Sequence, residues 1–370
     1  MTSCKKVTSS VESRISYIDL LETFCICMVL FYHCTLSDIE LLNEAYSVPS
    51  YIHYYLLSAA SASIPLFFFI NGFLLFQKPL NLTKHIKKAI RFFLQGIAFG
   101  ILSAIFYLSI TNQPINFFEI YDSVRFFKMG CCNHLWFLAS LVNIYILFPL
   151  IKSSYDHNKK VFSVFLSILF IFTYANNILN FSATLAYDAI FQQKSIIDFI
   201  DIFSIYDPFR GIKTFSVFYF CLGGMLHDAD SYLKDIPLKK KRIWGIALFL
   251  FGSFGLFFNG LLYTWLSGKY WDCFWNGYFN LFTVFIVIGI ILLVKDYHIK
   301  SSVLTLISKN TLGIYLIHYF AIVLIKPYFL NLILYKNLVS TLLFAFLIML
   351  ISLFCSVIIK KAPILKHLIS

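Results

Sequence analysis

The chain has 370 residues, of which 59% are hydrophobic and only 13% charged, and its mean hydropathy is +0.79. A soluble globular domain carries about 25% charged residues, so this composition excludes an ordinary soluble protein and indicates a membrane protein. The formal net charge of +12 does not indicate nucleic-acid binding, because the basic residues occur in short clusters between apolar segments. There they act as topology signals and contact anionic lipid headgroups.

Apolar segments long enough to cross a bilayer recur from one end of the chain to the other. We therefore expect an all-α, polytopic bundle of about ten transmembrane helices that forms one integral membrane domain over residues 1–370. The expected helices lie near 16–36, 51–76, 90–110, 134–151, 161–179, 214–227, 243–264, 274–294, 311–329 and 337–359.

The basic residues predict which side of the membrane each loop occupies. With ten spans and both termini in the cytoplasm, every Lys/Arg cluster falls on the cytoplasmic side, as the positive-inside rule requires. The longer connections near 111–133 and 180–213 then lie on the opposite side. We expect a multi-pass protein of the cell membrane, in the setting of a bacterial plasma membrane.

The first expected span, ETFCICMVLFYH at 22–33, carries a carboxylate at one end and an imidazole at the other. Glu22 and His33 are 11 residues apart, which places them on nearly the same helix face and about 16 Å apart. This polar line must face protein or water rather than lipid. His33 is either a catalytic base or an interfacial histidine that binds a backbone carbonyl. Asp19, one turn before Glu22, is explained most simply by pairing with Arg14 or a loop lysine.

Three other spans contain polar residues that are costly in a membrane. In the segment IPLFFFINGFLLF, Pro65 is expected to break the helix, and Asn71 either binds a neighbouring helix or takes part in a site. His134 lies at the expected outer end of the fourth span, and Trp136 beside it suits an aromatic belt. His318, in SKNTLGIYLIHYF, lies within the ninth span and needs a hydrogen-bond partner.

Four stretches of the chain are YIDLL to VLFYH (17–33), PLFFFINGFLL (65–75), HLWFLASLVNIYILFPL (134–150) and TLGIYLIH (311–318). In this order they resemble the acyltransferase-3 family, integral membrane O-acyltransferases that modify cell-surface glycans and related acceptors. The similarity extends over nearly the whole chain. A weaker fifth match is FYFCLGGML at 218–226.

The resemblance implies transfer of an acyl group, commonly acetyl from acetyl-CoA, to a sugar hydroxyl on the outer side of the membrane, without a metal. The partners would be acyl-CoA, a glycan acceptor and membrane lipids, with a glycosyltransferase or export protein as a further partner, and no nucleic acid. His33 matches the family's catalytic base. Histidine is the side chain whose ordinary pKa suits proton transfer near neutral pH. Oxyanion stabilisation would come from Asn71, His318 or backbone amides near Pro65.

Glu22 departs from the family pattern, which usually has Arg or Lys eleven residues before the catalytic histidine. A cation at that position could bind a CoA phosphate, whereas a carboxylate repels one. Either other basic residues supply the charge, or the donor differs, or activity has been lost, or Glu22 orients another catalytic group. The basic residues nearest in the predicted topology are Arg14, Lys84, Lys87 and Lys88.

Two other functions fit a polytopic bundle with buried polar residues. One is a transporter or flippase for a polysaccharide or lipid-linked glycan, although no inverted repeat is visible. The other is a non-catalytic partner of a glycan synthase, which the departure at Glu22 leaves open.

Overall fold

The computed structural model describes residues 15–36, 48–126, 132–192, 200–298, 300–333, 336–363 and 365–369. These residues form helices and no strand, which confirms the expected all-α polytopic bundle. Within the described residues, eight helical segments are long and apolar enough to cross a membrane. They are Ser16–His33, Val48–Phe76, Leu82–Ile110, Asn133–His157, Lys159–Phe191, Leu238–Ser267, Ser302–Leu332 and Leu338–Lys361.

The remaining two expected spans also fall on helices of the described chain. The expected helix at 214–227 lies within α8 (Thr214–Lys234). The expected helix at 274–294 is divided into α10 (Cys273–Gly277) and α11 (Leu281–Val294). Asn280 causes this division, because its backbone is extended and its side-chain oxygen caps the next helix by accepting from the Phe282 N–H at 3.0 Å.

The second expected span is also broken, as the proline in it predicts. Its two parts are α2 (Val48–Ala60) and α3 (Ser63–Phe76). The break lies just before Pro65 rather than at it. Pro65 occupies the first turn of α3, where its missing N–H would have no intrahelical partner in any case.

Several helices are longer than their apolar segments. Lys-rich turns precede the apolar residues of α4 (Leu82–Ile110), which the Asn81 side chain caps through the Lys84 N–H. The remaining elements are α1 (Ser16–His33), α5 (Phe117–Phe126), η1 (Asn133–Leu135), α6 (Trp136–His157), α7 (Lys159–Phe191), η2 (Ser204–Tyr206), η3 (Arg210–Ile212), α9 (Leu238–Ser267), α12 (Ser302–Leu332), α13 (Leu338–Lys361) and α14 (Lys366–Ile369).

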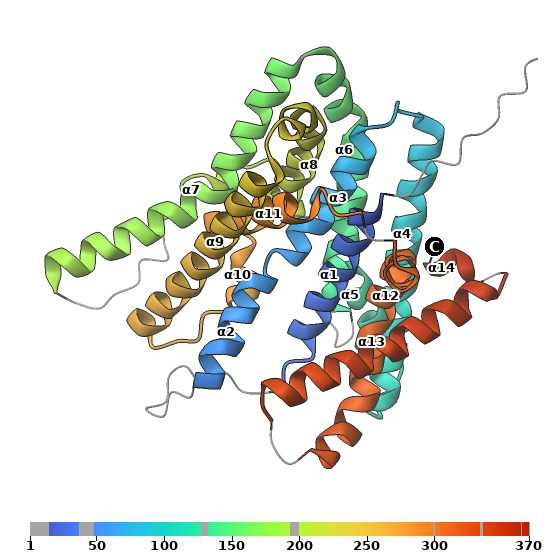
Figure 1. The fold of residues 1–370 in the computed structure, drawn as a ribbon. Coiled ribbons are helices and arrows are strands. Elements are labelled where there is room, and N and C mark those ends of the chain that lie inside the picture. Colours follow the sequence, from blue (N-terminus) through green and yellow to red (C-terminus); the bar gives the residue numbers. More distant parts are fainter. Residues whose placement is uncertain are drawn as a thin grey trace, which may run out of the picture.

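Helix α1 lies in the middle of the bundle, where it contacts α3, α12 and α13. Figure 1 shows α7 and α9 on one side of α1 and α3, and α12 and α13 on the other. Buried apolar residues line most of α1, including Leu21, Ile26 and Leu30. Asp19 and Thr23 are buried as well, so these polar residues of α1 face protein rather than lipid, as its sequence requires.

Helices α3 and α8 pack with their backbones in contact. A Cβ atom at Gly72 would lie 1.8 Å from the Phe220 carbonyl oxygen, and one at Gly223 would lie 2.0 Å from the Phe69 carbonyl oxygen. Small residues permit such close approach in membrane proteins. This interface fixes α3, which carries Asn71, against the rest of the bundle.

Candidate active site

His33 is the last residue of α1 and belongs to a cluster of three histidines and one tyrosine, which we call the histidine cluster: His33, His134, His318 and Tyr319. A hydrogen bond of 2.9 Å joins His33 Nδ1 to the Tyr319 hydroxyl. The ring centroids of His33 and His318 are 5.3 Å apart, and those of His134 and His318 are 4.9 Å apart. The Tyr319 ring stacks on His134 at 4.6 Å. Helices α1 and α12 and the turn η1 thus bring the three imidazoles together.

The hydrogen bonds of the cluster define which nitrogens can act on a ligand. His318 Nδ1 lies 2.6 Å from the Tyr315 carbonyl oxygen. Because a carbonyl can only accept, Nδ1 carries the hydrogen, and the Nε2 of a neutral His318 presents a lone pair. His318 Nε2 and both ring nitrogens of His134 are buried, and none of them has a hydrogen-bond partner within the described residues. Buried polar atoms of this kind normally bind water or a ligand.

A cavity of about 30 Å³ adjoins the histidine cluster at the predicted extracytoplasmic end of α1, and we call it the outer cavity. It has room for about one water molecule. His33 and His134 therefore face a cavity and not lipid. Trp136, expected in an interfacial belt, also lines it, as do Tyr32, Trp275 and Tyr278.

A second cavity, of about 210 Å³, lies toward the predicted cytoplasmic side, and we call it the inner cavity. Glu22 and Asn71 line it. Ile64, Phe137 and Tyr315 line both this cavity and the outer one, so these three side chains separate the two. The Tyr315 hydroxyl donates a hydrogen bond to the His134 carbonyl oxygen, which fixes its position. The two cavities together form an interrupted path along α1, from Glu22 to His33.

The carboxylates of α1 bind hydroxyl groups of α12. The single hydrogen of the Ser308 hydroxyl is shared between Asp19 Oδ1, 3.0 Å away, and Glu22 Oε2, while Thr305 donates to Asp19 Oδ2 at 2.9 Å. The expected partner Arg14 lies outside the described residues. Glu22 is thus held at the wall of the inner cavity, about three turns of helix from His33.

Asn71 does not join the histidine cluster. Its side-chain amide donates to the Phe67 carbonyl of its own helix at 2.9 Å, and the residue lines the inner cavity only. Of the four expected catalytic residues, the structure thus brings His33 and His318 together and places Glu22 and Asn71 at the other cavity.

The basic residues near the inner cavity differ from those that the sequence favours. Lys309 and Lys360 line the cavity, although sequence reasoning treated them only as topology signals. The Lys88 Nζ lies 5.6 Å from the ring centroid of Phe92, which is a lining residue. Lys84 and Lys87 are exposed on α4 and do not line the cavity.

One further cation lies beside the outer cavity. The Lys213 Nζ is 5.5 Å from the ring centroid of Trp275. Lys213 connects η3 to α8 with φ at 67°, a conformation that is costly for a residue other than glycine. Burial lowers the pKa of this ammonium group below its ordinary value. No sequence pattern marks this residue.

Comparison with known proteins identifies the family of the chain. A family model described as an acyltransferase domain matches residues 15–361, which is nearly the whole described chain. No curated protein and no solved structure matches the chain. Among the described residues, no group of three or more His, Cys, Asp or Glu side chains is arranged to hold a metal ion.

Proposed function

Because the chain belongs to the acyltransferase-3 family, we propose that it transfers an acyl group from cytoplasmic acyl-CoA to a hydroxyl of an extracytoplasmic glycan. Acetyl-CoA is the simplest donor. The observation that supports this most is the pair of cavities along α1, which are separated only by the side chains of Ile64, Phe137 and Tyr315. A donor from one side and an acceptor from the other could meet there without opening the membrane to water.

His33 acts as the general base in this proposal. As the sugar oxygen attacks the thioester carbonyl, His33 Nε2 accepts the hydroxyl proton, a C–O bond forms and the C–S bond breaks. The imidazolium then returns the proton to the departing CoA sulfur. For Nε2 to carry the lone pair, Nδ1 must carry a hydrogen and donate it to the Tyr319 oxygen, 2.9 Å away. Tyr319 is therefore a positioning residue.

His134 is a better candidate than His318 for stabilising the oxyanion. A neutral imidazole always carries one N–H, and neither nitrogen of His134 has a partner within the described chain. A neutral His318 presents an acceptor at Nε2, so it could stabilise an oxyanion only when protonated. Asn71 lies at the inner cavity and suits the donor instead.

The inner cavity suits the pantetheine arm of acyl-CoA. Glu22 and Asn71 can bind the amide groups of the arm, which are neutral, so a carboxylate at position 22 is no obstacle there. The CoA phosphates would then remain at the cytoplasmic surface, near Lys309, Lys360 and Lys88. This assignment accounts for the absence of the family's usual cation at position 22.

The test is the His33→Ala variant in cells that lack the chromosomal gene. Loss of general base catalysis should lower the rate of acyl transfer by about 10² to 10⁴, and so remove nearly all alkali-labile acetyl groups from the surface polysaccharide. The matched control is His157→Ala, which removes the exposed last residue of α6 and should leave acetylation unchanged. Full acetylation by His33→Ala would remove the proposed role of His33. Loss of the polymer itself from the surface of the deletion strain would indicate transport instead.

A further inference from the structure

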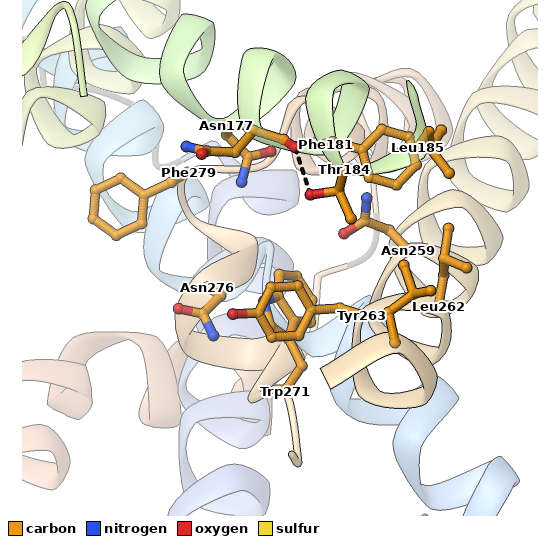
Figure 2. Close-up of a pocket in the computed structure, with 12 residues that line it drawn as sticks. Asn177, Phe181, Thr184, Leu185, Asn259, Leu262, Tyr263, Trp271, Asn276 and Phe279 are labelled. Atoms are coloured by element: carbon orange, nitrogen blue, oxygen red, sulfur yellow. Dashed lines mark hydrogen bonds between the residues drawn. The ribbon is translucent and has the colours of Figure 1, made fainter. Parts of the chain in front are cut away.

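A third cavity, of about 250 Å³, lies between α7, α9 and the segment 271–280. We call it the amide cavity, because asparagines from all three elements line it. They include Asn177 on α7, Asn259 on α9 and Asn276 in α10. Figure 2 shows these three side chains around one opening, with the rings of Tyr263 and Trp271 beside them. By the predicted topology, the cavity lies on the extracytoplasmic side.

The amide groups are held in place but keep hydrogen-bonding capacity for a ligand. Asn280 donates to Asn177 Oδ1 at 3.3 Å and to Asn259 Oδ1 at 3.4 Å. Within the described chain, the amide nitrogens of Asn177 and Asn259 have no partner of their own, and the Asn276 side chain has none at all. Each side-chain amide has two N–H donors and an oxygen that can accept two hydrogen bonds. The cavity therefore presents unused donors and acceptors on three sides.

The composition of the amide cavity indicates the class of ligand. Among the described residues, none with a charged side chain lines it, so a phosphate, a carboxylate or an ammonium group would lose its hydration without an ionic partner. A fatty chain would leave the amides unsatisfied. A neutral sugar fits both features, because its hydroxyls bind amides and its C–H faces pack on aromatic rings such as Trp271 and Phe279.

The segment 271–280 lies between this cavity and the histidine cluster. Trp271, Asn276 and Phe279 line the amide cavity, whereas Trp275 and Tyr278 line the outer cavity. One short turn of the chain thus forms a wall of both cavities. The Asp272 side chain caps α10 by accepting from the N–H groups of Phe274 and Trp275, which stabilises this wall.

We propose that the amide cavity binds a neutral sugar residue of the acceptor glycan, at a distance from the residue that is acylated. This inference rests on the proposed function for the identity of the ligand as the acceptor. It follows that the acceptor is a chain of several sugars and not a monosaccharide. One residue occupies the amide cavity while another presents its hydroxyl to the histidine cluster.

The experiment measures binding to the purified full-length protein in nanodiscs. Maltotetraose and chitotetraose serve as neutral probes, and tetragalacturonate serves as an anionic probe of the same length. The variants Asn276→Leu and Asn177→Leu keep the side-chain volume and remove the amide. The control Asn143→Leu removes an amide that donates to the Ala139 carbonyl of its own helix, at 2.9 Å. Thermal unfolding of each variant reports whether the fold is retained.

At least one neutral probe should bind, and each variant at the amide cavity should weaken its binding about tenfold. The control should bind as the native protein does, and tetragalacturonate should bind far more weakly. Failure of both neutral probes to bind, equal binding by the variants, or equal binding of the anionic probe would overturn the proposal. Absence of binding with acyl transfer intact would refute the sugar site alone. Binding without acyl transfer would refute the proposed function alone.

Discussion

Replacement of Tyr319 by phenylalanine tests the proposed catalytic geometry directly. The change removes one hydroxyl, 2.9 Å from His33 Nδ1, and keeps the ring that stacks on His134. A hydrogen bond between neutral groups contributes about 1 kcal/mol, which corresponds to about a fivefold loss of rate. The loss arises because the hydrogen on His33 is no longer directed to Nδ1, so less of the protein has its lone pair at Nε2.

The assay follows the conversion of acetyl-CoA to CoA by mass spectrometry. Thiol reagents are unsuitable, because the chain itself contains nine cysteines. The Tyr319→Phe variant should lower kcat about fivefold and leave KM for acetyl-CoA unchanged, because Tyr319 does not line the inner cavity. Its unfolding temperature should remain close to that of the native protein.

A double-mutant cycle separates this role from a structural one. In the His33→Ala background, Tyr319→Phe should cause no further loss, because the group that it orients is gone. An equal fivefold loss in both backgrounds would show that Tyr319 acts independently of His33. An unchanged kcat in the single variant would refute the assigned role of the hydrogen bond.

Two further predictions concern the bundle and the donor. Gly72→Ala places a Cβ atom 1.8 Å from the Phe220 carbonyl oxygen, so it should lower the free energy of unfolding by about 3 kcal/mol. Gly96→Ala, whose Cβ atom would lie 3.7 Å from its nearest neighbour, should have little effect. Equal unfolding temperatures would contradict the close packing of α3 on α8. The Lys309→Ala, Lys360→Ala double variant should raise KM for acetyl-CoA about tenfold at low salt, and less at high salt. An unchanged KM would place the CoA phosphates elsewhere.

The positions of the helices could be predicted from the sequence because membrane helices are marked by local composition. The predicted positions of the helix ends are less accurate, since a helix continues beyond its apolar residues until a capping residue ends it. Asn81 begins α4 well before its apolar part. Asn280, read as part of one long helix, divides that helix into α10 and α11. The effect of a single capping side chain is not visible in hydropathy.

The candidate site could be predicted only in part. The sequence marks His33 and His318 separately, as costly polar groups in apolar segments, but their contact depends on how α1 packs against α12. Lys309 was visible as a charge, but its place at the inner cavity depends on the same packing. The sequence gives no indication of the amide cavity, because Asn177 and Asn276 are far apart in the chain and neither is unusual in its own segment.

The short length of α11 bears on where the proposed acyl transfer would take place. Its 14 residues extend about 21 Å, whereas the hydrocarbon core of a bilayer is about 30 Å thick. With Lys295 at the predicted cytoplasmic surface, the turn at 271–280 would begin below the outer headgroups, and the amide cavity and outer cavity that it lines would form a recess within the membrane. An acceptor that enters this recess would leave bulk water before it meets the thioester. The fold would in this way favour sugar over water as the nucleophile and limit wasteful hydrolysis of the donor.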